Sequence, residues 1–335
     1  FRRTPYIALG LLLCVIGVIV SPQVAFLMAA SPALGILAAA LAFGAWGMGY
    51  NLSAVSYLSL ATEISGEKSR GRTIAIMWFM MIVSIILTSI SISRMVEPYS
   101  PQVLEQAFIV VALAALGLGI LGLIKVEERS AKGQTRSAEE HSLGEMVRVI
   151  RKSPQVTTFF FYLLLLLAAI LGQDILLEPF AAEAFGMTVQ QTTRITSIWG
   201  VSVLLAILAA GALERRAPRK AVAQTGNLGA LTGFLFIIAG GFLQNSAVFY
   251  VGVVLLGIGT GLSTVANLAL MFDLTLPGYV GLFIGAWGVS NAMSRLVGTL
   301  MAGIVRDVAT FLTENALLGY MIVFGIEALM LAAAA

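Results

Sequence analysis

Ten apolar stretches, each long enough to cross a lipid bilayer, constrain what this chain can fold into. A transmembrane helix needs about 20 apolar residues, whereas a strand of a membrane barrel needs about ten. Only 11% of the residues are charged, against roughly 25% in a soluble domain. The pattern predicts an all-α membrane protein with spans over residues 6–29, 33–62, 73–95, 104–124, 156–178, 191–212, 222–243, 246–271, 280–304 and 316–334.

A long polar segment divides these spans into a group of four and a group of six. Residues 125–155 carry EERSAKGQTRSAEEHS and lack apolar periodicity over most of their length, which favours a solvated linker. A regulatory or partner-binding role is the alternative. We therefore expect an N-terminal lobe over 1–124, a cytoplasmic linker over 125–155 and a C-terminal lobe over 156–335.

The turn after the second span and the turn after the eighth resemble each other. A shift of 210 residues places Glu63 on Asp273 and Gly71 on Gly281, and an apolar span follows each glycine. Such a parallel internal repeat is typical of transporters built from two similar halves. Because four and six spans are unequal, we expect two more spans before Phe1 in the full protein, twelve in all.

Basic residues are concentrated in the loops on one side of the predicted bundle. Sixteen of the 20 Lys and Arg residues precede the first span or follow the second, fourth and sixth. By the positive-inside rule, both ends of the chain face the cytoplasm. We assign the net charge of +3 to membrane topology and expect no nucleic-acid partner. The segment QDILLEPFAA, residues 173–182, then lies at the outer face.

The segment QDILLEPFAA places an amide and two carboxylates at the end of an apolar span. These groups belong to Gln173, Asp174 and Glu178, at a depth where a charge is costly unless it has a function or a partner. Asp174 and Glu178 are four residues apart, so one continuous helix would place both on the same face. Pro179 disfavours helical geometry at the preceding residue and is expected to end the span at Glu178. Two solvated acids at a helix end are the alternative.

Other polar residues lie deeper in the predicted spans. Asn51 and Asn291 lie in the second and ninth spans, where they would form hydrogen bonds between helices or contact a ligand. Arg295 also lies in the ninth span and needs an acceptor, for which we predict Glu327 in the last span. The alternative for this arginine is a contact to an anionic ligand or lipid.

The sequence contains none of the usual catalytic or metal-binding patterns. Its one cysteine, Cys14, lies in an apolar span, and its one histidine, His141, lies in the polar linker. Gly257, Gly259 and Gly261 lie inside a span, where glycines favour close helix packing over a phosphate loop. We therefore expect a protein that is not an enzyme and that binds no metal ion directly.

The loop GALERRAPRK, residues 211–220, resembles the loop between the second and third helices of each half in the major facilitator superfamily. The resemblance implies a two-lobe helical bundle. Arg215 stands where that family usually has aspartate, so the aspartate's salt bridge would pass to Glu214, and Pro218 replaces a glycine.

Structural or gating roles are assigned to the charged residues Glu63, Arg70, Arg72, Glu214, Arg216, Arg219, Asp273, Arg295 and Glu327.

Longer segments resemble the PucC family, the "BCD" branch of the major facilitators. They are FRRTPYIALG, LSLATEISGEKSRGRTIAIMWFMM, QDILLEPFAAEAFGMT and VGLFIGAWGVSNAMSRLVGTLMAGIVRD. Arg295 departs from the family, which has a small residue there. The resemblance implies an accessory factor for light-harvesting complex assembly that binds or delivers chlorophyll or bacteriochlorophyll. It also implies a thylakoid or intracytoplasmic membrane, with light-harvesting or photosystem subunits as partners.

A chlorophyll magnesium would need an oxygen ligand here, because the predicted spans contain no histidine. Hard Mg²⁺ accepts such ligands readily. The candidates are Glu178, Asp174, Gln173, Asn51 and Asn291, with Glu178 first. Two alternative functions are a secondary transporter that moves a small amphipathic solute by alternating access, and a structural subunit of a larger photosynthetic membrane complex.

Overall fold

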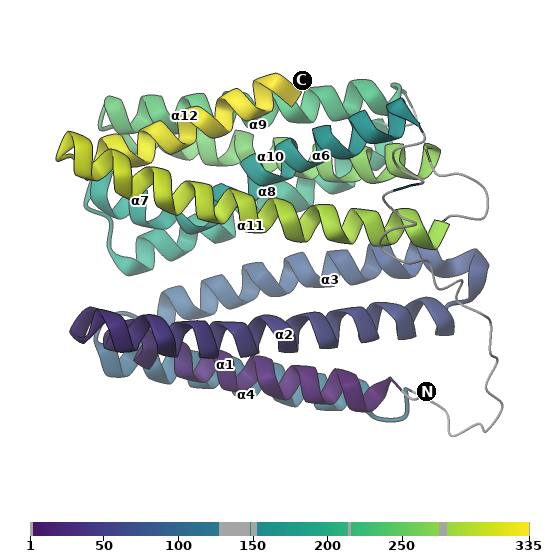
Figure 1. Ribbon diagram of the computed structural model, residues 1–335, viewed down its shortest axis with the longest axis horizontal. Coiled ribbons are helices and arrows are strands. Elements are labelled where there is room, and N and C mark those ends of the chain that lie inside the picture. The colour runs from purple at the N-terminus through teal and green to yellow at the C-terminus, as the bar shows by residue number, and fades with distance from the viewer. Residues whose placement is uncertain (1–2, 127–147, 149–152, 214–215, 275–279, 335) are drawn as a thin grey trace. The chain divides into compact units, whose positions relative to one another are not determined.

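The structure is a computed structural model that describes residues 3–126, 148, 153–213, 216–274 and 280–334. Within the helices, it leaves out the side chains of 59, 62, 63, 66–72, 74, 75, 78, 280–282 and 284. The described elements are helices, and nine of them are long and apolar enough to cross a membrane (Figure 1). The predicted all-α, multi-pass membrane protein is therefore confirmed.

The first compact unit contains four helices, α1 (Thr4–Ala30), α2 (Pro32–Ile64), α3 (Gly66–Met95) and α4 (Pro101–Leu123). Helices α1, α2 and α4 begin with proline in the first two positions, where the missing N–H has no helical partner to lose. Helix α1 packs between α2 and α4. The predicted third span lies in α3, whose described apolar stretch is the shorter range Phe79–Met95.

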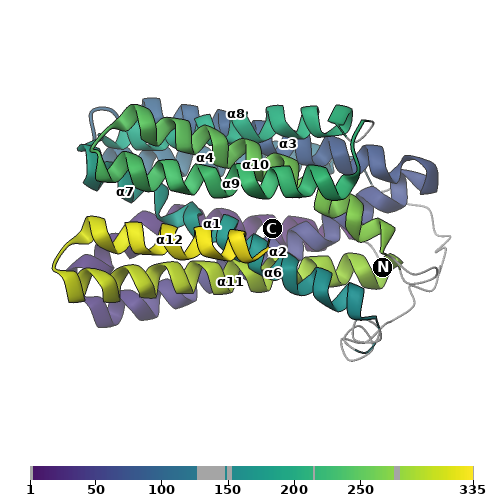
Figure 2. The same ribbon diagram turned by 90° about the horizontal axis from the view of Figure 1, so that it is seen from above.

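The second compact unit contains the remaining elements (Figure 2). They are α6 (Pro154–Gly172), the 3₁₀ turn η1 (Gln173–Ile175), α7 (Leu177–Phe185), α8 (Val189–Leu213), α9 (Arg219–Phe242), α10 (Ser246–Asp273), α11 (Val280–Thr313) and α12 (Ala316–Ala334). Helix α10 packs against α8 and α9, while α11 packs against α6 and α12. Helix α12 also contacts α9, so it joins the two groups.

Glycines bring α10 close to both of its neighbours. A β-carbon built on Gly259 would lie 2.6 Å from the carbonyl oxygen of Gly226 on α9. On the other side of α10, β-carbons on Gly257 and Gly261 would lie 2.8 Å and 2.5 Å from carbonyl oxygens on α8. These distances are shorter than real β-carbons tolerate, so the predicted packing role of this glycine series is confirmed.

For the fifth span, predicted over residues 156–178, the predicted end is wrong. Helix α6 ends at Gly172, the 3₁₀ turn η1 follows, and α7 then begins at Leu177. Pro179 therefore does not end a helix. It lies in the first turn of α7, where the backbone N–H that proline lacks would have no intrahelical acceptor.

The glycine packing predicts that Gly259→Ala destabilises the protein by about 1–3 kcal/mol, because the added methyl group forces α9 and α10 apart. The matched control is Gly303→Ala on α11, where a β-carbon meets nothing within 4 Å. That control should be neutral or slightly stabilising, because alanine favours helix more than glycine does. Thermal unfolding followed by tryptophan fluorescence in detergent measures both. Equal midpoints for the two variants would contradict the assignment.

Candidate functional site

Helix α6 ends at Gly172, where it packs closely against two neighbouring helices. A β-carbon on Gly172 would lie 2.5 Å from Oε1 of Glu327 on α12 and 3.1 Å from the carbonyl oxygen of Gly298 on α11. Only glycine lets α6 approach both helices this closely, and glycine is also a weak helix former. The α-helix ends at this glycine, and the turn η1 that follows it contacts α11.

Asp174 is held by one neighbour in sequence and one on another helix. Its Oδ1 accepts a hydrogen bond of 2.8 Å from Nε2 of the buried Gln173. Its Oδ2 lies 3.6 Å from Nη1 of Arg295 on α11. The side chains of Asp174 and Arg295 remain 32% and 62% exposed, so this polar group is open on one side.

The predicted pairing of Arg295 with Glu327 is wrong. Arg295 pairs with Asp174, and neither carboxyl oxygen of Glu327 has a hydrogen-bond partner among the described residues. The reason is that the turn η1 places Asp174 beside the exposed face of α11, while Glu327 is fully buried behind Gly172. The prediction that Arg295 needs an acidic partner still holds, with a different acid.

The carboxyl group of Glu178 contacts α8, whereas the carboxyl group of Asp174 contacts α11. Its Oε1 accepts a hydrogen bond of 2.5 Å from Oγ1 of Thr196 on α8. Burial raises the pKa of the Glu178 carboxyl above its ordinary value, and the hydrogen bond from Thr196 opposes this by favouring the ionised form. The expectation that Asp174 and Glu178 share one helix face is wrong, because the break after Gly172 puts them on successive elements with separate partners.

Most of the remaining side chains in QDILLEPFAA anchor the short helix α7. Leu176, Leu177, Phe180 and Ala181 are all buried. The ring of Phe180 lies at the centre of an aromatic cluster, with centroid distances of 5.2–6.1 Å to Phe324, Phe249, Tyr320 and Phe185. Buried aromatic pairs of this kind are worth about 0.5–1.5 kcal/mol each beyond their area. The segment is thus largely a packing motif that carries two acids at its edge.

The two predicted asparagines make contacts within their own helices. Asn51, exposed on α2, donates to the carbonyl oxygen of Gly47 at 2.9 Å, and Asn291 on α11 donates to that of Trp287 at 3.1 Å. Asn291 precedes Arg295 by four residues, so it lies on the same helix face as the Asp174–Arg295 pair. Asn51 belongs to the first compact unit, whereas the Asp174–Arg295 pair belongs to the second.

Two of the predicted gating residues meet at the opposite end of the second unit. Arg219, at the start of α9, forms an ion pair and hydrogen bond with Asp273, at the end of α10. Arg216 is exposed in the turn that precedes α9. Four other charges given gating roles, on Glu63, Arg70, Arg72 and Glu214, lie outside the described residues or side chains.

A buried polar network joins α6, α9 and α10, and the sequence analysis missed it. Asn227 donates to the hydroxyl oxygen of Tyr162 at 2.9 Å and accepts from the hydroxyl of Ser263 at 2.8 Å. Asn267, one turn beyond Ser263, is buried beside this network. The available signal was the recurrence of amides and hydroxyls at helical spacing inside apolar spans, which favours hydrogen bonds between helices.

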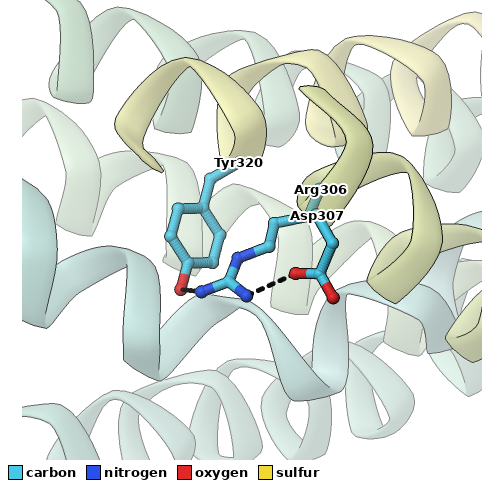
Figure 3. Close-up of polar contacts among 3 residues, drawn as sticks. All are labelled: Arg306, Asp307 and Tyr320. Atoms are coloured by element: carbon cyan, nitrogen blue, oxygen red, sulfur yellow. Dashed lines mark hydrogen bonds and ion pairs between the residues drawn. The ribbon is translucent and has the colours of Figure 1, made fainter. Parts of the chain in front are cut away.

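A second missed group links α11 to α12 (Figure 3). Nη1 of Arg306 donates to Oδ1 of Asp307 at 2.6 Å, and its Nη2 donates to the hydroxyl oxygen of Tyr320 at 2.9 Å. The guanidinium carbon also lies 4.9 Å from the centre of the Tyr320 ring, in a cation–π arrangement. Because Tyr320 packs on Phe180, this group connects the α11–α12 turn to α7.

The donor set at QDILLEPFAA fits some ligands and not others. Among the described residues, no three His, Cys, Asp or Glu side chains converge in the way that a bare metal ion requires. The magnesium of a chlorophyll is already held by the pigment's ring nitrogens and would need only one further oxygen ligand from the protein. One carboxylate oxygen of Glu178 or Asp174 is therefore chemically sufficient for it.

The fold is similar to that of solved transporters of the major facilitator type. The nucleoside transporter NupG superposes with a TM-score of 0.76 at 15% identity, covering 100% of this chain and 82% of that one. A POT family transporter has a TM-score of 0.70 at 12% identity, with 99% and 80% covered. At these identities the likeness establishes the fold alone.

Sequence relatives agree over most of the chain. It is 28% identical over 300 residues to "Protein PucC" of Cereibacter sphaeroides, covering 88% of this chain and 65% of that protein. "Protein PucC" of Rhodobacter capsulatus is 27% identical, with 89% and 66% covered, and the "Bacteriochlorophyll synthase 44.5 kDa chain" of R. capsulatus is 28% identical, with 100% and 79% covered. This chain thus spans about two thirds of the PucC proteins' length. The model of the "PUCC protein" family matches residues 1–335, so the chain belongs to the PucC family.

Proposed function

We propose that this protein is an accessory factor for the assembly of photosynthetic pigment–protein complexes, and that it binds chlorophyll or bacteriochlorophyll. The match of the family model to the whole chain is the observation that carries the proposal. It is supported by the names of two relatives, one called a bacteriochlorophyll synthase chain and one described by its place in a "puhA-bchM intergenic region". We assign the protein to a photosynthetic membrane with both ends of the chain in the cytoplasm, and light-harvesting or photosystem subunits as its partners.

The geometry favours the QDILLEPFAA segment as the pigment site. Glu178 is only partly buried, and the hydrogen bond from Thr196 occupies its Oε1, which leaves Oε2 to ligate a magnesium ion. Three residues earlier in the chain, the apolar side chain of Ile175 is 46% exposed and offers a surface for the macrocycle. Phe159 and Phe160 are core residues, and the ring of Phe160 packs against that of Phe283, so neither is free to form a pigment wall.

The proposal predicts that Glu178→Ala lowers the amount of co-purified pigment several-fold, because the carboxylate oxygen that would hold the magnesium is lost. Protein purified from a phototrophic host is measured by the ratio of chlorophyll to protein absorbance, together with mass spectrometry of co-isolated subunits. The matched control is Glu183→Ala, which removes an exposed acid from the same helix. Colourless wild-type protein without antenna or photosystem subunits would overturn the proposal.

Pigment retention should also depend on pH through Glu178. Its folded-state pKa is raised above 4.5 by burial, so the carboxylate ligand is present above that raised pKa and is lost as the pH falls through it. Removal of the Thr196 hydroxyl takes away a bond that favours the ionised form. Thr196→Val should therefore move the midpoint of pigment loss to higher pH, as followed by absorbance during acid titration. A midpoint that stays or moves lower would contradict this role.

The transporter alternative rests on the fold shared with NupG and the POT family transporter. It predicts ion-dependent uptake of an amphipathic solute into vesicles that contain the protein, with uptake lost in Glu178→Gln. A protein that instead co-purifies with a photosynthetic complex and carries neither pigment nor transport activity would be a structural subunit. The same purified sample and its vesicles therefore separate the three functions.

A further inference from the structure

An arginine side chain is exposed well inside the apolar stretch of α11. That stretch runs from Gly285 to Thr313, and Arg295 lies ten residues beyond its start. At a rise of about 1.5 Å per residue, the arginine is about 15 Å from the nearer end. Its side chain is nevertheless 62% exposed. A cation at such a depth is costly unless its N–H groups find acceptors.

Asp174 balances the charge of Arg295 but does not satisfy its hydrogen-bond donors. The distance of 3.6 Å between Nη1 of Arg295 and Oδ2 of Asp174 defines an ion pair, yet it is too long for a hydrogen bond. A guanidinium group has five N–H donors, and in the described part of the chain none of those of Arg295 reaches an acceptor at hydrogen-bond distance. Because the ion pair has no net charge, an uncharged oxygen can complete it without bringing a further charge into the membrane.

Contacts with α6 fix the side of α11 on which Arg295 lies. The preceding residue, Ser294, is fully buried, and its hydroxyl donates to the carbonyl oxygen of Leu164 at 3.1 Å. One turn later, a β-carbon on Gly298 would be too close to the backbone of Ala168. With these two residues held against α6, the guanidinium is placed at the edge of the helix contact by packing that does not involve its own side chain.

Small residues leave space on the surface beside Arg295. Gly288 and Ala292 are exposed on the same face of α11, seven and three residues before the arginine. A β-carbon built on Gly288 would meet nothing within 4 Å. The apolar side chains of Val289 and Leu296, at the margin of this face, are 40% and 53% exposed. The helix thus presents a low apolar surface with a guanidinium at one end, which suits an apolar ligand that carries an acceptor oxygen.

We propose that Arg295 donates a hydrogen bond to a carbonyl oxygen of the bound pigment, and so helps to determine which pigment the protein takes. The inference rests on the proposed pigment binding, and it concerns a contact separate from the magnesium ligand at Glu178. A chlorophyll-type macrocycle is apolar and uncharged and carries ketone and ester carbonyl oxygens at its edge. A hydrogen bond with a charged donor is about twice as strong as one between neutral groups. Pigments without a carbonyl group at this place lose the contact and bind more weakly.

A pair of metal-free pigments tests this contact without magnesium ligation. One probe is the magnesium-free pigment with its ring ketone, and the other has the same macrocycle with the ketone reduced to a methylene group. Each is titrated into the full chain in vesicles of an ether-linked phospholipid, which has no ester carbonyl, and quenching of tryptophan fluorescence gives the Kd. We expect the wild-type protein to bind the ketone probe about tenfold or more tightly than the methylene probe, because hydrogen bonds to charged groups contribute that much.

Arg295→Met removes the donors and should abolish this preference, so that the two probes bind equally. The matched control is Arg194→Met, which removes an exposed arginine from α8 of the same unit and should keep the wild-type preference. The preference is a ratio of two Kd values measured on one protein sample. A variant that folds in reduced yield therefore still reports it.

The outcomes distinguish this inference from pigment binding as such. A wild-type protein that binds both probes equally, or neither, would overturn the role of Arg295, as would an unchanged preference in Arg295→Met. Pigment co-purified from the phototrophic host then still tests the proposed function by itself. The titrations are repeated in ester-linked phospholipid, where an unchanged preference supports the pigment as the ligand. Loss of the preference in that lipid would instead assign the arginine to a lipid ester carbonyl.

Discussion

The contact of Gly172 with Glu327 and Gly298 is the constraint on which this end of the second unit depends. Three helices meet there at distances that only glycine permits, and α6 stops at this glycine, seven residues before Pro179. The chain then uses its polar residues in a turn, where Gln173 and Asp174 bond to each other. A longer α6 would have left Asp174 and Glu178 on one face. The break instead gives the two acids partners on two different helices, Arg295 on α11 for Asp174 and Thr196 on α8 for Glu178.

The aromatic anchor of α7 shows how one segment serves both packing and chemistry. Phe180 fixes the short helix in the core of the unit, so Glu178, two residues earlier, is held in place at the edge of that core. Functional groups are positioned best when they lie on elements that packing has already made rigid. The Arg306–Tyr320 contact adds to this, because it ties the neighbouring helix turn to the same aromatic cluster.

The spans could be predicted from sequence because their length and apolarity depend on local composition alone. The close packing at Gly172 could not, since it involves residues more than 120 positions away in the chain. For the same reason the partner of Arg295 was wrongly assigned: the need for an acid is local, but the choice between Asp174 and Glu327 depends on how α6 and α11 cross. Asn227 and Asn267 escaped notice because single amides scarcely alter the average hydropathy of a span. The glycine series was interpreted correctly, since its spacing alone indicates close packing.

The length of α11 has a consequence for how the unit meets the bilayer. Its 34 residues extend for about 51 Å, whereas the hydrocarbon core of a membrane is about 30 Å thick. The helix must therefore tilt or extend beyond the hydrocarbon. Beyond Arg306, its last turns carry Phe311 and Leu312, which are 83% and 73% exposed. With a charge followed by exposed apolar side chains, this end of α11 has the character of an interfacial helix, and lipid headgroups would surround it as closely as lipid tails surround its middle.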